Sequence, residues 1–198
     1  ASDQVPLHPM RVFTELEPLL PEDAFLVFDG GDFVQWGRCY LKARRPGRWL
    51  RLGPLGHLGA GLPFALACKV AHREAPVFLF TGDGSLGFYA MELDTAVRHR
   101  LNIVAVGGNE SAWGIDRGFQ LAYYGRAVGT DLRWVAYERM AEALDAYGEG
   151  VERAGDLAPA LRRAMASGRP SLLNIRIRSA PSPLAEAMVA RRRAGHQE

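Results

Sequence analysis

Three places in the sequence put an acid or an amide beside glycine just after a short apolar run. The runs are FLVF at 25–28, VFLF at 77–80 and IVAV at 103–106. The polar groups that follow are Asp29-Gly30-Gly31, Gly82-Asp83-Gly84-Ser85 and Gly108-Asn109-Glu110-Ser111. Carboxylate and amide oxygens suit Mg²⁺ or Ca²⁺ better than zinc, and glycine lets backbone N–H groups approach an anion closely. These residue types predict a metal ion bridged to a diphosphate.

A single GDG turn is also common where no ligand binds. Its Asp then only accepts hydrogen bonds from backbone amides or caps the following helix. The pairing is more specific, because GDG-Ser at 82–85 is followed by a helical stretch, the next apolar run and then Asn109. Ligands bind beyond the carboxyl ends of the strands of an open parallel sheet. Asp83 and Asn109 are therefore expected to meet at one edge.

The elements that must position these residues alternate between strand and helix. The apolar runs are short, unalternating and rich in Val, Ile and Phe, as buried parallel strands are. Weaker strand patterns lie at 150–153 and 171–177, and helical spacing lies at 10–20, 33–42, 60–73, 90–100, 112–122, 134–147 and 156–167. The sequence predicts an α/β fold, a single parallel sheet in a three-layer domain with helices on both faces. The irregular stretch 43–59 is expected to be a functional loop.

Composition favours one folded domain. Of the 198 residues, 48% are hydrophobic and 23% charged, and the net charge of +2 is too small to indicate a nucleic-acid partner. No apolar run reaches the roughly 18 residues of a membrane span, and the N-terminal sequence lacks a signal-peptide pattern. We expect a cytoplasmic protein with no membrane partner, a domain at 1–180 and a C-terminal tail or short helix at 181–198.

Two arginine clusters and two cysteines have simpler interpretations. Either arginine cluster could hold a phosphate-bearing substrate, although runs of like charge usually face water. The clusters are Arg44-Arg45-Arg48-Arg51 and Arg191-Arg192-Arg193. Cys39 and Cys68 lie in apolar stretches without metal-ligand spacing, which predicts that both fill the core.

The GDG and Asn spacing resembles the thiamine-diphosphate motif, in which Asn follows GDG some two dozen residues later. The resemblance extends over GDGSLGFYAMELDTAVRHRLNIVAVGGNESAWG, with GHLGAGLPFALA before it and YGRAVGTDL after it. From His8 to about Ile177, the chain resembles the C-terminal, diphosphate-binding domain of the acetolactate-synthase-like family. Oxalyl-CoA decarboxylase, 2-hydroxyacyl-CoA lyase, glyoxylate carboligase and benzaldehyde lyase are members of this family.

The resemblance implies a thiamine-diphosphate-binding fold and a set of ligands. It places Mg²⁺ on Asp83, on the side chain of Asn109 and on the backbone carbonyl of Ser111. It implies that thiamine diphosphate is contacted by Gly31, Asp32, His57, Leu58, Gly82, Gly84, Ser85, Ser111 and Trp113.

Some of these positions keep a second interpretation. Leu58 falls where the family props the cofactor into a bent conformation, but it could also pack in an ordinary glycine-rich loop. Asp32 lines the pocket, caps the following helix, or does both. His57 is the one candidate catalytic group, as a proton shuttle, and positioning is its alternative role. Trp113 belongs either to the pocket wall or to the core.

Thiamine chemistry also needs a glutamate against the aminopyrimidine ring. The family carries it on a different, pyrimidine-binding domain across a subunit interface. Five glutamates of this chain lie in helical segments and close no apolar strand, so none is expected to serve: Glu15, Glu17, Glu92, Glu138 and Glu142. The resemblance therefore implies a pyrimidine-binding partner, as a separate chain or a missing N-terminal part. A homo-oligomer is expected, or a heterotetramer if the partner is a separate chain.

The reaction implied by the resemblance is acetolactate-synthase-like carboligation or decarboxylation of 2-oxo acids. One alternative is a 2-hydroxyacyl-CoA lyase or oxalyl-CoA decarboxylase-like subunit acting on an acyl-CoA. An alternative of another class is a non-catalytic, flavodoxin-like module that binds a nucleotide or a partner. That module would need no Asp and Asn pair.

Overall fold

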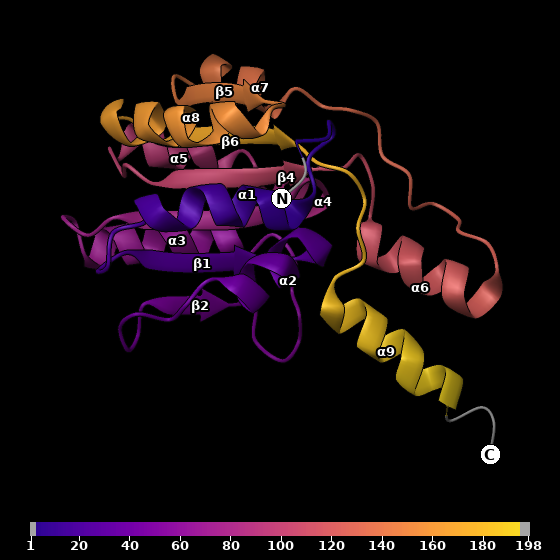
Figure 1. The fold of residues 1–198 in the computed structure, drawn as a ribbon. Coiled ribbons are helices and arrows are strands. Elements are labelled where there is room, and N and C mark those ends of the chain that lie inside the picture. The colour runs from indigo at the N-terminus through magenta and orange to yellow at the C-terminus, as the bar shows by residue number, and fades with distance from the viewer. Residues whose placement is uncertain (1–2, 195–198) are drawn as a thin grey trace.

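Six parallel strands form the sheet of the structure, a computed structural model that describes residues 3–194. The strands are β1 (Phe25–Asp29), β2 (Trp49–Arg51), β3 (Val77–Gly82), β4 (Val104–Asn109), β5 (Tyr147–Val151) and β6 (Ser171–Arg176). Their order across the sheet is β2-β1-β3-β4-β6-β5 (Figure 1). The carboxyl ends of β1, β3 and β4 are therefore neighbours, and the predicted α/β fold is confirmed.

Helices cover both faces of this sheet. One face packs against α1 (Pro9–Leu16), α2 (Gly31–Tyr40) and α8 (Ala154–Ala166), with the 3-10 turn η1 (Glu17–Leu19) beside them. The other face packs against α3 (Gly61–Ala71), α4 (Asp83–Tyr89), α5 (Glu92–Arg98) and α7 (Tyr137–Ala143). Alternate strand residues point to opposite faces, so Phe28 joins the first core and Val27 the second. None of the helices within residues 3–194 is long and apolar enough to cross a membrane.

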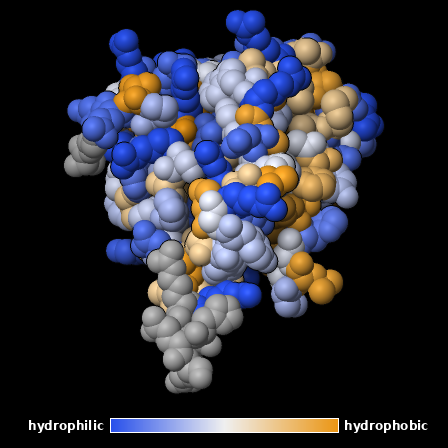
Figure 2. Space-filling view, turned by 90° about the vertical axis from the view of Figure 1, so that its right-hand side faces the viewer, coloured by the Kyte–Doolittle hydropathy of each residue, from blue (hydrophilic) through white to orange (hydrophobic). Residues whose placement is uncertain are grey.

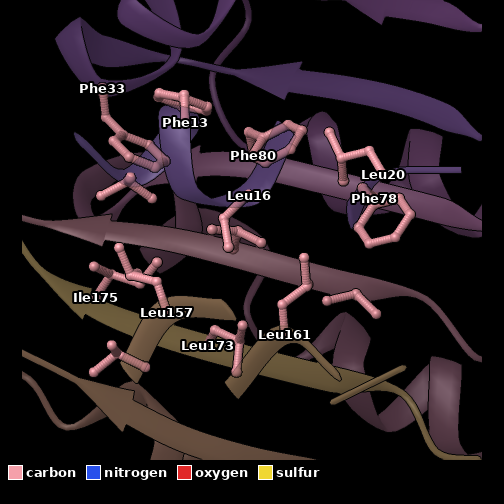
Figure 3. Packing of buried hydrophobic residues seen from close by; sticks show 14 of the residues in the cluster. Phe13, Leu16, Leu20, Phe33, Phe78, Phe80, Leu157, Leu161, Leu173 and Ile175 are labelled. Atoms are coloured by element: carbon pink, nitrogen blue, oxygen red, sulfur yellow. The ribbon is translucent and has the colours of Figure 1, made fainter. Parts of the chain in front are cut away.

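Aromatic packing in the first core fixes the position of α2. The Phe13 ring on α1 lies 4.8 Å from the Phe33 ring on α2 and 5.3 Å from the Phe80 ring on β3 (Figure 3). Gly108 makes room for this cluster, because a Cβ there would lie 2.4 Å from the Phe33 ring. Burying one such Phe contributes about 1.5–3 kcal/mol. The N-terminus of α2 is thereby held at the carboxyl edge of the sheet.

Two helices lie beyond that edge. In Figure 1, α6 (Gly114–Tyr124) and α9 (Pro183–Ala194) extend side by side past the carboxyl ends of the strands. The guanidinium of Arg192 lies 4.8 Å from the Tyr123 ring, which ties α9 to α6. The segment 181–198, expected to be a tail or short helix, contains α9, and its last positions, 195–198, lie outside the described residues.

The edges of the sheet differ from the prediction. The stretch 43–59, predicted to be irregular, contains β2, and the strand predicted at 150–153 runs instead over Tyr147–Val151. Both are edge strands whose pairing depends on β1 and β6 rather than on an apolar pattern of their own. Cys68 is buried, but Cys39 is exposed, so the prediction that both fill the core is wrong for Cys39.

Candidate functional site

A small cavity lies where β1, β3 and β4 end. Its volume is about 50 Å³, and its walls include the predicted metal ligand Asp83 and most of the residues predicted to contact the cofactor: Gly31, Asp32, Leu58, Gly82, Gly84, Ser85 and Trp113. The predicted ligands Asn109 and Ser111 lie outside this wall. Gly30, with a φ of 64°, turns the chain there from β1 into α2, and a Cβ at this position would lie 1.9 Å from Ser85 Oγ. The turn thus requires glycine in both conformation and space.

Asp83 is the buried acid of this cavity. It follows β3 as the first residue of α4, and only 4% of its surface is exposed. Burial raises its pKa to about 6, although the backbone amides of Gly84, Ala112 and Ser111 act in the opposite direction. The carboxylate therefore lies among backbone N–H groups from two strand ends, in a position where a cation would offset the cost of its burial.

Asn109 ends β4 beside Asp83 and is 2% exposed. Its Oδ1 accepts a hydrogen bond from Ser111 N–H at 3.2 Å, and its Nδ2 donates to the Val135 carbonyl at 3.1 Å. Ser111 has a left-handed φ of 56°, and its carbonyl accepts from Leu132 N–H at 2.8 Å. The chain thus adopts a locally strained backbone to turn sharply next to Asp83.

The donor atoms at this edge fit a hard cation. Among the described residues, no cluster of three or more His, Cys, Asp or Glu side chains could hold a metal ion. A metal ion here would use the Asp83 carboxylate together with amide and carbonyl oxygens, the ligand chemistry of Mg²⁺.

Asp29 fixes the glycine-rich loop next to the cavity, a role that the sequence analysis did not assign to it. Its Oδ1 accepts from Gly59 N–H at 3.1 Å and its Oδ2 from Gly61 N–H at 2.9 Å. Leu58, in this loop, lines the cavity and packs against the turn after β1, because a Cβ on Gly30 would lie 2.6 Å from its Cδ2. His57 points elsewhere, since it is exposed, its ring centroid lies 6.3 Å from that of Tyr89, and it is not part of the cavity wall.

A second cavity of about 280 Å³ adjoins the first. The two share Gly31, Leu58, Ile115 and Asp116. Its rim carries Arg38 and Arg51, and Arg38 Nη1 donates to Gln35 Oε1 at 2.6 Å. Burial and the charge of Arg51 lower the pKa of Arg38. The ion pairs found among the described residues include neither arginine.

The other arginines of the predicted clusters have separate contacts. Arg44 pairs with Glu17 at 2.6 Å, and Arg48 lies 3.8 Å over the Phe25 ring. Arg51 is therefore the member of the first cluster that reaches a cavity next to the site. In the second cluster, Arg192 contacts Tyr123.

Asp32 joins the cavity to the C-terminal segment. The N-cap of α2 is Gly30, so the capping interpretation of Asp32 is wrong. Its Oδ1 instead accepts from Ser182 N–H at 3.0 Å, and burial raises its pKa. Trp113 lines the cavity next to Gly84, because a Cβ on Gly84 would lie 2.6 Å from its ring.

The sequence analysis overlooked Glu110. Its side chain lines the cavity, and its Oε2 is buried without a hydrogen-bond partner. Burial first, and the nearby charges of Asp83 and Asp32 next, raise its pKa to about 7. Its position directly after Asn109, at the end of a buried strand, was the signal that could have found it.

Comparison with known proteins identifies the family of this chain. Residues 29–175 match the family model described as the thiamine pyrophosphate enzyme, C-terminal TPP binding domain. A "Probable acetolactate synthase" of Mycobacterium bovis is 44% identical over 174 residues, which are 87% of this chain and 32% of the relative. A "2-hydroxyacyl-CoA lyase 2" of Mus musculus is 39% identical over 142 residues, 72% of this chain and 22% of the relative.

A solved structure extends the agreement to the fold. The thiamine diphosphate-dependent 4-hydroxybenzoylformate decarboxylase of Rhodococcus jostii RHA1 superposes with a TM-score of 0.85 at 25% identity. The match covers 92% of this chain and 34% of that one, so the chain spans about a third of the length of such relatives. With its cavity at the carboxyl ends of β1, β3 and β4, the chain belongs to the thiamine pyrophosphate enzyme family and corresponds to its C-terminal TPP-binding domain.

Proposed function

We propose that this chain binds the diphosphate of thiamine diphosphate through Mg²⁺ held by Asp83, Asn109 and the Ser111 carbonyl. The buried Asp83 carboxylate in the wall of the cavity, next to the end of β4 where Asn109 lies buried behind that wall, carries this proposal. The N–H groups of Gly84 and Ser85 lie in the first turn of α4, where backbone donors lack helical partners. The Ser85 N–H is proposed to donate to a phosphate oxygen, and the Gly84 N–H could do so once a cation binds the Asp83 carboxylate to which it now donates.

Bound thiamine diphosphate would supply an electron sink for making or breaking a bond next to a carbonyl carbon. The chain's residues would hold it in place. Leu58 lies in the wall shared by the two cavities, where it can support the cofactor between its diphosphate and its reacting end. His57 lies on the outer surface of the same loop, so proton transfer by His57 would require a partner domain to bring the cofactor near it.

We propose 2-oxo acids as the substrates, in carboligation or decarboxylation. The second cavity supports this choice, because it adjoins the cofactor cavity and carries two arginines that form no ion pair among residues 3–194. Guanidinium groups recognise carboxylates in a planar, two-pronged geometry. The carboxylate of a small 2-oxo acid would lie against Arg38 and Arg51, with its carbonyl toward the shared wall at Leu58.

This substrate assignment is tested in the complex with the partner. Arg51→Gln is expected to raise KM for pyruvate about tenfold, the equivalent of about 1.4 kcal/mol, with unchanged affinity for thiamine diphosphate. Arg45→Gln removes the same charge from an exposed residue outside the cavity and is the control. Equal KM values for both variants would rule out the arginine pair.

A partner domain is proposed to cover the surface around the glycine-rich loop. Leu55 is 94% exposed, and Met91, Phe88 and Tyr89 are 64%, 57% and 40% exposed. Phe88 and Tyr89 lie against the glycine-rich loop, because a Cβ on Gly59 would contact both. Figure 2 views the end of the molecule beyond the strands and shows apolar residues gathered on its right-hand side. Exposed apolar side chains gathered on one side are typical of an interface, here with a pyrimidine-binding domain, within a homo-oligomer or a heterotetramer.

Acyl-CoA cleavage is the second candidate function. It is favoured by the similarity to 2-hydroxyacyl-CoA lyase 2 of Mus musculus. Assays of the complete complex with pyruvate and with a 2-hydroxyacyl-CoA separate the two. Turnover of the acyl-CoA alone would favour lyase chemistry.

Cofactor binding is tested on this chain by itself. Titration with thiamine diphosphate, followed by calorimetry, is expected to give binding that requires Mg²⁺ and is lost with a chelator. ATP and FMN serve as comparison ligands. Binding of FMN without metal, and none of thiamine diphosphate, would overturn the proposal in favour of a flavodoxin-like module.

A further inference from the structure

A chain of buried amides runs from helix α7 to the proposed metal site. Glu138 on α7 accepts from Asn174 Nδ2 at 2.7 Å, and Asn174 Oδ1 accepts from Asn109 Nδ2 at 3.1 Å. The Val135 carbonyl accepts from Nδ2 of both asparagines at 3.1 Å. Asn109 and Asn174 are each 2% exposed, so water cannot replace these partners.

Glu138 and the Val135 carbonyl determine which groups of this network donate hydrogen bonds and which accept them. A carboxylate and a backbone carbonyl accept hydrogen bonds and cannot donate them. Glu138 and Val135 therefore require Asn174 to turn its NH₂ toward them, which leaves its Oδ1 facing Asn109. Only the NH₂ group of Asn109 can meet that oxygen.

The orientation of Asn109 follows from this. With Nδ2 directed at Asn174 and Val135, its Oδ1 faces the opposite side and accepts from Ser111 N–H at 3.2 Å. A flipped amide would set two donors against each other at Ser111 and two acceptors against each other at Val135. It would also present NH₂, which cannot bind a cation, to the site beside Asp83.

We infer that Glu138 and Asn174 are positioning residues that fix the amide of Asn109 with its oxygen toward the cation beside Asp83. The inference rests on the proposed Mg²⁺ site. It assigns a role to a glutamate that the sequence alone placed in an ordinary helical segment. Neither positioning residue lines the cofactor cavity, so both act through Asn109.

A charge-neutral and a charge-changing variant separate the effect of the Asn109 amide orientation on Mg²⁺ binding from the effect of the Glu138 charge. Asn174→Leu removes the relay and leaves every charge in place. Glu138→Gln replaces the carboxylate, which can only accept, by an amide that can turn either its oxygen or its NH₂ group toward Asn174. Each is expected to raise the Mg²⁺ dissociation constant about tenfold at saturating thiamine diphosphate, equivalent to about 1.4 kcal/mol. Glu142→Gln, an exposed residue on the same helix, is the charge-matched control and is expected to bind Mg²⁺ like the wild type.

The metal-free melting temperature is measured for every variant, because a merely structural role would lower it and leave Mg²⁺ affinity unchanged.

A second measurement needs no cofactor. In ¹⁵N NMR spectra of the metal-free chain, the Asn109 side-chain NH₂ protons are expected to exchange slowly with water, and faster in Asn174→Leu. Wild-type Mg²⁺ affinity in Asn174→Leu, or equal weakening by Glu138→Gln and Glu142→Gln, would overturn the inference. A wild-type chain that binds no Mg²⁺ with thiamine diphosphate would instead refute the proposed function, and the NMR comparison would still test the relay.

Discussion

The two sides of the cofactor cavity are built differently. On the side of Asp83 and Asn109, the polar side chains are almost fully buried and are held by strand ends, backbone amides and a second amide at Asn174. On the side of the glycine-rich loop, Asp29 holds Gly59 and Gly61, whereas Leu55 and His57 before them are exposed. The chain thus completes its proposed diphosphate side by itself and leaves the other side to be covered.

The largest expected effect comes from breaking the buried side. Asp83→Ala is expected to weaken Mg²⁺-dependent binding of thiamine diphosphate at least about 100-fold, equivalent to about 2.7 kcal/mol. The fold should persist, because the residue lies at the end of a strand and its burial is itself unfavourable. Calorimetry and circular dichroism measure the two properties. Asp156→Ala, at an exposed site on α8, is the control, and unchanged affinity in Asp83→Ala would contradict the metal assignment.

The exposed side is tested through its partner. The isolated chain is expected to show no turnover of pyruvate with Mg²⁺ and thiamine diphosphate, because the activating glutamate would be on the pyrimidine-binding domain. In the presence of that domain, Leu55→Asp is expected to weaken association about 30-fold, about 2 kcal/mol. Analytical ultracentrifugation measures it, with cofactor binding by the chain alone as the control. Robust turnover by a monomer would refute the two-part site.

A substitution at Leu58, between the two sides of the cavity, is expected to separate binding of thiamine diphosphate from its activation. Leu58→Ala should leave the affinity for thiamine diphosphate within about threefold, because the proposed anchor at Asp83 is independent of Leu58. It should slow hydrogen exchange at the thiazolium carbon of the complete complex about tenfold or more. Leu52→Ala, on the wall of the second cavity only, is the comparison. An exchange rate equal to the wild type would rule out Leu58 as the prop.

The smallest effect concerns the pH dependence of the metal-free buried side. The raised pKa values of Glu110 (about 7, from 4.5) and Asp83 (about 6, from 3.8) mean that the folded chain holds protons which the unfolded chain has released. The free energy of unfolding should therefore be highest below pH 3.8 and fall as the pH rises from 3.8 to about 7. Glu110→Gln should remove about 3 kcal/mol of this fall, measured by urea unfolding in a chelator. An unchanged slope would show that Glu110 is not desolvated.

The sequence predicted what depends on local pattern. The buried strands β1, β3 and β4 are continuous apolar runs, so their carboxyl ends, and the residues that follow them, could be placed at one edge. The metal and cofactor roles assigned to those residues stay predictions. Three-residue β2 could not be found, because its pairing with β1 defines it and its own pattern does not.

Contacts between side chains that lie far apart in the sequence could not be predicted, because they depend on how distant segments pack together. Glu138, Asn174 and Asn109 meet only because α7, β6 and β4 are packed together, and their sequence separations give no sign of it. Arg38 and Arg51 likewise reach one cavity from a helix and an edge strand. Glu110 could have been found from the sequence, because it directly follows Asn109 at the end of an apolar run, unlike the five glutamates in helical segments.

The hydrogen bond from Ser182 to Asp32 has a consequence for biosynthesis. It joins residues 150 positions apart in the chain. The strands β1, β3 and β4, in contrast, have all been synthesised once the chain reaches Asn109. During synthesis from the N-terminus, the sheet edge is complete while the Asp32 carboxylate still lacks its partner. The hydrogen bond that holds Asp32 in the cavity wall is therefore formed only after all six strands have been synthesised.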